Sequence, residues 1–243
     1  MRILIKFAYN GSNYSGYQKQ DNAASIQQTI EQAFSEKLGQ QIKLCASGRT
    51  DAKVHALCQC AHFDCDIKFS PEKFVEIAKC ILPEDIVVYQ AKQVADDFDA
   101  RKDVKRKTYM YVYAKKRERI PFTYNFAPFL ERCVNIEKMK LASKQLLGTN
   151  NFKAFCASGS QVKTFERTIY SVDIEDTTDF LTFKITGNGF LYNMVRIIVG
   201  TLMDIGSGLL EEGAIQKMLK TGDRKHGGRT AKAQGLYLFD VEY

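Results

Sequence analysis

Four residues near position 50 have the side chains and the close spacing that a catalytic loop needs. Residues 48–56 read GRTDAKVHA, which places Arg49, Asp51, Lys53 and His55 within seven positions. Apolar runs flank this stretch on both sides, so we predict that it is a loop joining two strands. Loops on a rigid sheet often carry catalytic groups.

Asp51 is the single carboxylate of this stretch and could act as a nucleophile or as a general base. Arg49 carries a planar, permanently charged guanidinium that suits a phosphate or a carboxylate. The alternative is a structural turn, in which the aspartate caps backbone amides and the cations face water. Because structural ion pairs also gather charges, charge alone favours this alternative.

A second stretch, residues 187–200, places one charge inside an apolar run. It reads GNGFLYNMVRIIVG, and its apolar residues recur with the period of a helix around Arg196. An arginine in a protein interior needs a partner, because an unpaired buried charge is very costly. The residues alone do not name that partner.

Both stretches resemble signatures of one family. Residues 48–56 closely resemble G-R-T-D-A-G-V-H-A, and residues 187–196 resemble G-N-x-F-L-x-x-M-V-R, both from the TruA family of tRNA pseudouridine synthases. The resemblance implies that Asp51 is the catalytic residue and that Arg49 helps to displace the target base. It also implies that Arg196 pairs with Asp51, which would keep the aspartate ionised and oriented.

Lys53 departs from the family pattern, which usually has glycine at this position. A loop that needs a positive backbone angle there would be strained by lysine. A loop that does not need one would gain a possible phosphate contact.

Three further motifs extend the resemblance over almost the full chain. Residues 107–111 resemble R/K-x-Y-x-Y, whose first tyrosine lines the uridine pocket, and this implies substrate binding by Tyr109. Leu236 corresponds to a leucine near that pocket, although core packing is an equal interpretation. Residues 14–20 resemble Y-x-G-W-Q-x-Q and are expected to form a packed surface loop. For Tyr111 and Tyr113 we predict core packing.

The resemblance implies an isomerase that converts uridine to pseudouridine at positions 38, 39 and 40 of the tRNA anticodon stem-loop. It implies a homodimer bound to tRNA, with no metal and no small-molecule cofactor. The chain has 35 Lys and Arg against 28 Asp and Glu, a net charge of +7. A basic chain of this kind suits a polyanionic partner.

The fold that the resemblance implies is α+β. It consists of two ferredoxin-like (RRM-like) halves that form a joined antiparallel sheet, with helices on one side and a basic central cleft. We expect an N-terminal half, residues 1–103, with the catalytic aspartate loop. Residues 104–243 would form a C-terminal half that completes the active-site cleft.

Local patterns predict several elements directly. Ser25 and Gln28 have the spacing of a capping box, and Gly39 suits the position after a helix end. A second helix should begin at Pro71. The first half therefore reads strand, helix, strand, strand, helix, strand, an order typical of split β-α-β units.

Two other classes of function remain open. A non-catalytic RNA-binding protein on the same scaffold would explain the charge and the tyrosines, but not a lone carboxylate in a basic loop. A metal-dependent hydrolase could use Cys58, Cys60 and His62, which would share one face of a strand. Zinc knuckles, however, usually have C-x2-C spacing in a turn.

The sequence also indicates location. The first residues, MRILIKF, are too charged for a signal peptide, and no run of about 18 apolar residues is present. We therefore expect a cytoplasmic protein with reduced cysteines and no membrane partner.

Overall fold

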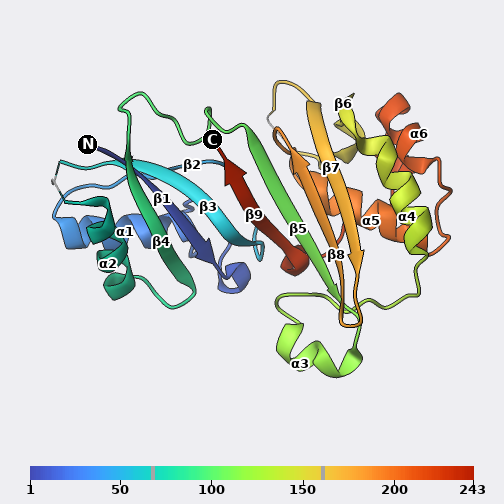
Figure 1. Ribbon diagram of the computed structural model, residues 1–243, viewed down its shortest axis with the longest axis horizontal. Helices are drawn as coiled ribbons and strands as arrows, with labels where there is room; N and C mark the ends of the chain where they lie inside the picture. Colours follow the sequence, from blue (N-terminus) through green and yellow to red (C-terminus); the bar gives the residue numbers. More distant parts are fainter. Residues whose placement is uncertain (67–68, 160–161) are drawn as a thin grey trace. The chain divides into compact units, whose positions relative to one another are not determined.

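The computed structural model describes residues 1–66, 69–159 and 162–243. The chain divides into two compact units, which are Met1–Lys105 with Tyr237–Tyr243 (unit 1) and Arg106–Leu236 (unit 2). Each unit combines β-strands with α-helices (Figure 1), which is compatible with the predicted α+β class. Within the described residues, no helix is both long and apolar enough to cross a membrane.

Unit 1 is a β-sheet with two α-helices. Its elements are β1 (Arg2–Tyr9), α1 (Ile26–Leu38), β2 (Cys45–Ala46), β3 (His55–Asp64), α2 (Pro71–Ile81), β4 (Ile86–Val94) and, from Tyr237 onwards, β9 (Leu236–Glu242). The first six follow the predicted order. Strand β1 lies between β3 and β4 and is antiparallel to both, while β3 also pairs with β2 and, in parallel, with β9.

One face of the unit 1 sheet packs on both helices. The ring of Phe63 on β3 lies 5.7 Å from Phe34 of α1 and 5.6 Å from Phe74 of α2. All three rings are buried, as are Ile5 and Phe7 of β1. Burying each such side chain stabilises the fold by about 1.5–3 kcal/mol. This core gives the strands that flank Asp51 a rigid support.

Helix α1 begins and ends where the sequence predicts. Ser25 Oγ accepts the amide of Gln28 at 3.3 Å, and Gly39 takes the left-handed conformation with φ of 64°. The reciprocal bond of a capping box is not seen, because Gln28 Oε1 is buried without a hydrogen-bond partner among the described residues. Only half of the predicted capping box therefore forms.

Unit 2 consists of antiparallel strands with helices of its own. Its elements are β5 (Arg106–Ala114), α3 (Ile120–Thr123), α4 (Ile136–Ser143), β6 (Gly148–Asn151), β7 (Glu166–Asp176), β8 (Phe180–Gly187), α5 (Met194–Gly206) and α6 (Ala214–Thr221). The strand order is β5-β8-β7-β6. Short 3-10 turns in the chain lie at Gly11–Asn13, Arg117–Arg119, Lys144–Leu146, Lys153–Phe155, Arg224–His226 and Ala233–Gly235.

Two tyrosines of β5 belong to the core of unit 2. Tyr111 is completely buried, and its hydroxyl donates to the carbonyl of Lys232 at 2.8 Å. Tyr113 is half-buried and its ring lies 4.9 Å from that of Tyr111. The predicted packing role is confirmed for Tyr111. Its bond also fixes the start of the segment that leads to Leu236.

Candidate active site

The predicted loop is present between β2 and β3 in unit 1. Asp51 is half-buried there, whereas Arg49 and Lys53 are exposed. The backbone turns at Asp51, where its carbonyl accepts the amide of Val54 at 3.1 Å. The loop thus places one half-buried carboxylate between two exposed cations.

Buried polar side chains from β1 and β3 hold this loop. The hydroxyl oxygens of Tyr9 and Thr50 are hydrogen-bonded at 2.7 Å, and Thr50 directly precedes Asp51 in the chain. Ser47 Oγ donates to Gln59 Oε1 at 2.7 Å, and Gln59 Nε2 donates to the carbonyl of Gly48 at 3.0 Å. Leaving such buried groups unpaired costs about 1–3 kcal/mol each. The loop is therefore fixed before any substrate arrives.

Gly16 brings a second segment against the backbone of Asp51. Its φ is 107°, and a Cβ there would lie 2.9 Å from Thr50 O and 3.3 Å from the carbonyl carbon of Asp51. The next amide, of Tyr17, donates to Thr50 O at 3.0 Å. The sequence predicted only a packed surface loop at 14–20. In the structure this segment also supports the loop that carries the carboxylate.

The backbone at Lys53 adopts the positive angle that the sequence left open. Its φ is 64°, a left-handed conformation that a non-glycine residue pays to adopt. The amide of Lys53 donates to the carbonyl of Tyr14 at 3.4 Å. The loop therefore requires the conformation that the family's glycine would adopt freely, and lysine adopts it with strain.

Replacing Lys53 with glycine should raise the free energy of unfolding by up to about 1 kcal/mol, measured by urea titration. Glycine adopts positive φ without steric cost, and the greater freedom of the unfolded chain offsets part of the gain. Lys53→Ala removes the same charge and retains the strain, so it should not stabilise. Equal stabilisation by both variants would contradict a backbone origin.

Arg196 lies in the first turn of α5 in unit 2. Its Nε donates to the carbonyl of Ala231 at 2.7 Å, and its Nη1 donates to Asn193 Oδ1 at 2.7 Å. Asn193 itself has a positive φ of 59°. Both acceptors are neutral, so these bonds orient the half-buried guanidinium and leave its positive charge in place.

The other two predicted site residues of unit 2 are Tyr109 and Leu236. Tyr109 on β5 is half-buried and meets Phe190 edge to face, with ring centroids 5.0 Å apart. This contact joins the predicted pocket tyrosine to the stretch that contains Arg196. Leu236 is buried and follows Gly235, where a Cβ would lie 2.6 Å from the Tyr111 ring. Arg49 and Asp51, in contrast, belong to unit 1.

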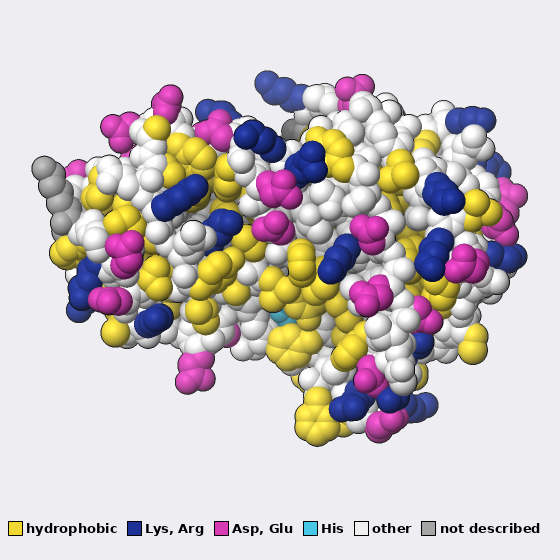
Figure 2. All heavy atoms as spheres, viewed as in Figure 1, with side chains coloured by type: hydrophobic (Ala, Val, Ile, Leu, Met, Phe, Trp, Pro, Cys, Tyr) yellow, Lys and Arg dark blue, Asp and Glu magenta, His cyan; other side chains and the backbone are white. Residues whose placement is uncertain are grey.

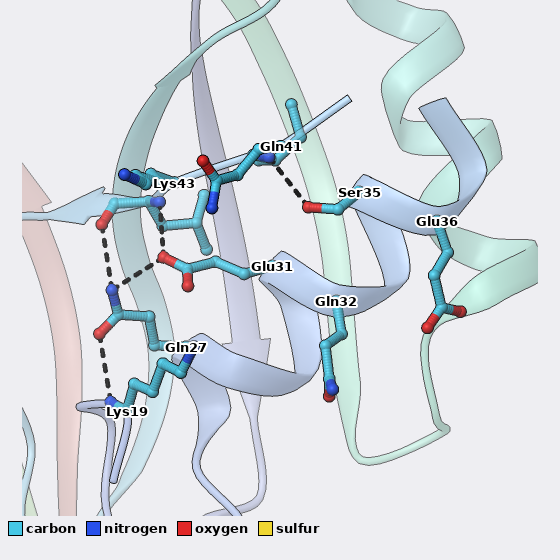
Figure 3. Close-up of a pocket in the computed structure, with 10 residues that line it drawn as sticks. Lys19, Gln27, Glu31, Gln32, Ser35, Glu36, Gln41 and Lys43 are labelled. Carbon is cyan, nitrogen blue, oxygen red and sulfur yellow. Dashed lines mark hydrogen bonds between the residues drawn. The ribbon is translucent and has the colours of Figure 1, made fainter. Parts of the chain in front are cut away.

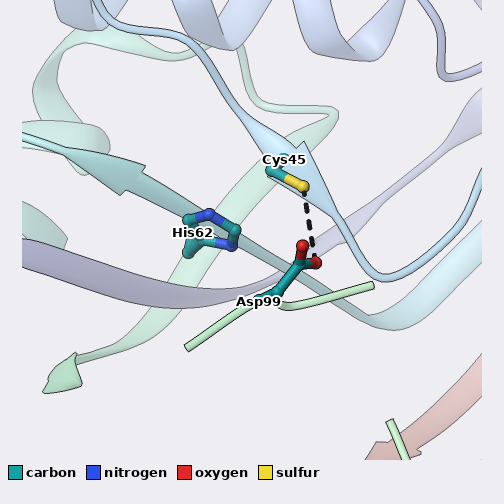
Figure 4. Close-up of side chains that lie close together, drawn as sticks. All are labelled: Cys45, His62 and Asp99. Atoms are coloured by element: carbon teal, nitrogen blue, oxygen red, sulfur yellow. Dashed lines mark hydrogen bonds between the residues drawn. The ribbon is translucent and has the colours of Figure 1, made fainter. Parts of the chain in front are cut away.

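One cluster of possible metal ligands lies elsewhere in unit 1. Cys45, His62 and Asp99 have ligand atoms within 4.8 Å of one another, and they form the single such group found among the described residues (Figure 4). The predicted alternative set, Cys58, Cys60 and His62, is not that group. Hydrogen bonds already engage the cluster, since His62 Nδ1 accepts the amide of Ala100 at 3.0 Å and Asp99 Oδ1 accepts that of Arg101 at 2.9 Å. These bonds give His62 and Asp99 a structural role without a metal ion.

Acid should destabilise the protein through His62. Burial, together with the Arg2 guanidinium, lowers the pKa of His62 in the folded chain. Below about pH 6.5 the unfolded chain binds a proton that the folded chain refuses, so the free energy of unfolding falls as pH decreases through that window. His62→Asn retains an acceptor and does not titrate, so its urea midpoint should change less between pH 7.5 and 5.5. An unchanged pH dependence of the urea midpoint in His62→Asn would exclude His62 as the cause.

One groove, lined mainly by polar and charged residues, lies away from these residues. It has a volume of about 610 Å³ and runs between α1 and residues 41–44 (Figure 3). Glu31 Oε1 accepts from Leu44 N at 2.8 Å and from Gln27 Nε2 at 2.9 Å across it. These bonds tie α1 to residues 41–44, and none of the predicted site residues lines the groove.

Comparison with known proteins connects the two signature stretches. The sequence profile of the tRNA pseudouridine synthase family matches residues 5–103 and 142–243. The chain belongs to this family. The first match contains the Asp51 loop and the second contains Arg196. Tyr109 lies between the two matches, so its assignment depends on the local motif and on its contact with Phe190.

Relatives named tRNA pseudouridine synthase A match over the whole chain. The protein of Thermoanaerobacter sp. (strain X514) is 43% identical over 241 residues, which cover 99% of each chain. That of Exiguobacterium sp. (strain ATCC BAA-1283 / AT1b) is 40% identical, covering 100% of this chain and 98% of the relative. That of Bacillus subtilis (strain 168) is 40% identical over 246 residues, covering 100% and 99%. This pseudouridine synthase chain therefore corresponds to its relatives from end to end.

Proposed function

We propose that this chain is a tRNA pseudouridine synthase that isomerises uridine to pseudouridine at positions 38, 39 and 40 of the anticodon stem-loop. Family membership and the full-length relatives support the reaction class. The observation that carries the proposal is Asp51, a half-buried carboxylate on a loop fixed by buried hydrogen bonds. A rigid, accessible carboxylate is what activation of a sugar requires.

The reaction divides into three tasks. The bond between N1 of uracil and C1′ of ribose breaks, the base turns, and a bond from C5 to C1′ replaces it. The hydrogen on C5 leaves as a proton and N1 gains one, so the product is an isomer and no redox cofactor is consumed. Asp51 either attacks C1′ or removes a sugar proton, and both routes need the ionised carboxylate.

The remaining site residues handle the base. Extracting a base from its stack costs a few kcal/mol, and the exposed guanidinium of Arg49 is suited to fill the gap left behind. Tyr109, held edge to face by Phe190, offers a flat surface and a hydroxyl to the detached uracil. Leu236 would add an apolar contact. Arg196 would pair with Asp51, as the family resemblance implies.

We also propose that units 1 and 2 are the two ferredoxin-like halves of each chain, and that two such chains form a cytoplasmic homodimer. The proposed dimer is supported by exposed aromatic side chains on and after α3, where Phe122 is 80% exposed and Tyr124 60%. Figure 2 shows exposed hydrophobic side chains beside Lys and Arg around α3. Exposed apolar side chains that cluster in this way mark interaction surfaces. Sedimentation of the purified protein measures its oligomeric state directly.

The test of the proposed reaction is release of tritium from tRNA labelled at uridine C5. Formation of the new bond at C5 expels the label, so the assay reports chemistry and not binding. Release that requires U38, U39 or U40 in the tRNA is the expected result. Tight tRNA binding without release from any tRNA would instead favour the non-catalytic RNA-binding alternative.

A further inference from the structure

The guanidinium of Arg196 depends on a segment that is distant in sequence. Its Nε–H donates to the carbonyl of Ala231, and the amide of Ala231 donates back to the carbonyl of Arg196 at 3.0 Å. The position of the guanidinium is therefore linked to the position of residues 228–231. What holds that segment also decides where Arg196 points.

Two buried polar residues of α5 hold the segment. The amide of Gly228 donates to Thr201 Oγ1 at 3.1 Å, and the amide of Arg229 donates to Asp204 Oδ2 at 3.0 Å. Thr201 is completely buried and Asp204 is 7% exposed. Thr201 and Asp204 lie about one to two helical turns beyond Arg196. Helix α5 therefore binds residues 228–231 through three side chains, those of Arg196, Thr201 and Asp204.

Glycines allow the segment to lie directly on the helix. A Cβ on Gly200 would collide with the carbonyl oxygen of Arg229, and one on Gly228 would lie 2.7 Å from both Asp204 Oδ2 and Gly200 O. With backbone this close to backbone, a small shift of the segment cannot be absorbed by side chains. A change at Thr201 therefore reaches Ala231 and, through it, Arg196.

We infer that Thr201 and Asp204 are positioning residues for Arg196, acting through the backbone of residues 228–231. The inference deepens the proposed function and rests on it for its effect on catalysis. Neither side chain needs to touch the substrate. They set the direction of the one guanidinium that the reaction is proposed to use.

Thr201 is the cleaner probe of the two. Asp204 also faces the guanidinium groups of Arg229 at 3.4 Å and Arg132 at 4.0 Å, so its removal changes charge as well as position. Thr201→Val keeps the shape of the side chain and removes only the hydroxyl. The buried amide of Gly228 then lacks an acceptor, which favours movement of the segment towards water.

The chain offers a matched control in Thr221. Its Oγ1 also donates to the carbonyl four residues earlier, at 2.8 Å, and also accepts a loop amide, that of Asp223 at 3.2 Å. Thr201 makes the same two kinds of bond, including one to Ile197 O at 2.8 Å. Thr221 is exposed, so Thr221→Val tests the loss of the same two kinds of hydrogen bond at the surface, where neither bond is made to residues 228–231.

The first test is a double-mutant cycle on kcat for tritium release at saturating tRNA. Thr201→Val should lower kcat by about tenfold to a hundredfold, as expected for a displaced catalytic group. Thr201→Ser should restore it, and Thr221→Val should not change it. In an Arg196→Lys background, Thr201→Val should have little further effect, because the group on which it acts is already gone. An equal fold loss in both backgrounds would overturn the inference.

The second test does not depend on activity. Solvent exchange of the Arg196 Nε–H, followed by NMR, should be slow in the wild type because this hydrogen is bonded to Ala231. Thr201→Val should accelerate it by about tenfold, and Thr201→Ser and Thr221→Val should not. Unchanged exchange in Thr201→Val would refute the link even if kcat falls. An inactive wild type would defeat the proposed function alone, since the exchange rates still decide the inference.

Discussion

Replacing Asp51 with asparagine should reduce tritium release from C5-labelled tRNA by about 10⁴-fold or more at saturating tRNA. The amide has nearly the shape of the carboxylate, so the loop held by Thr50 and Gly16 should keep its structure. It has neither the charge nor the basicity that activation of the sugar requires. Binding of tRNA, measured by filter retention, should change little, since a carboxylate contributes no attraction to phosphate.

Asp97→Asn provides the matched control for this experiment. It makes the same chemical change at an exposed position of unit 1, and activity should remain at the wild-type level. If the tRNA affinity of Asp51→Asn falls enough to account for the whole loss of tritium release, Asp51 contributes to tRNA binding and not to the chemical step. Near-normal kcat in Asp51→Asn would remove Asp51 from the mechanism.

The sequence predicted well where the signal is local. The start of α1 follows from the side chain of Ser25, and its end follows from the left-handed Gly39. The loop at Asp51 follows from a polar cluster between two apolar runs. In each case, residues within a few positions of one another determine the backbone, so a pattern in the sequence is sufficient.

The support of the loop could not be predicted in the same way. Gln59 lies in an apolar strand, and only the fold shows that its amide reaches back to Gly48. The positive φ of Lys53 is imposed by neighbours such as Tyr14, against the preference of lysine. Strand β9 ends the chain but pairs in parallel with β3, whose residues lie some 180 positions earlier. Contacts of this range leave no periodic signal.

The same contrast holds for the second signature. The apolar period around Arg196 predicts the helix, and the cost of a buried charge predicts that the arginine has partners. The sequence does not predict that two of these partners are the neutral oxygens of Asn193 and Ala231. Because these bonds orient the guanidinium without neutralising it, its charge stays available for a carboxylate.

Replacing Arg196 with alanine should therefore lower kcat by about 10³-fold at saturating tRNA, which corresponds to a rise of about 4 kcal/mol in the activation free energy. The acid limb of the pH–rate profile should also move to higher pH, because a carboxylate without its cation is protonated more readily. Arg196→Lys keeps a positive charge but loses the guanidinium that donates to the carbonyl of Ala231. Its kcat should therefore lie between those of the wild type and Arg196→Ala.

The pH shift separates an electrostatic role from simple loss of folded protein. A misfolded fraction lowers kcat by the same factor at every pH and leaves the position of the acid limb unchanged. An unpaired Asp51 shifts the acid limb to higher pH. Arg117→Ala removes an exposed guanidinium elsewhere in unit 2 and should change neither kcat nor the limb at saturating tRNA. If Arg196→Ala keeps near-normal kcat with an unshifted limb, the proposed pairing with Asp51 is wrong. The orientation given by Ala231 would then serve packing of the 228–231 segment alone.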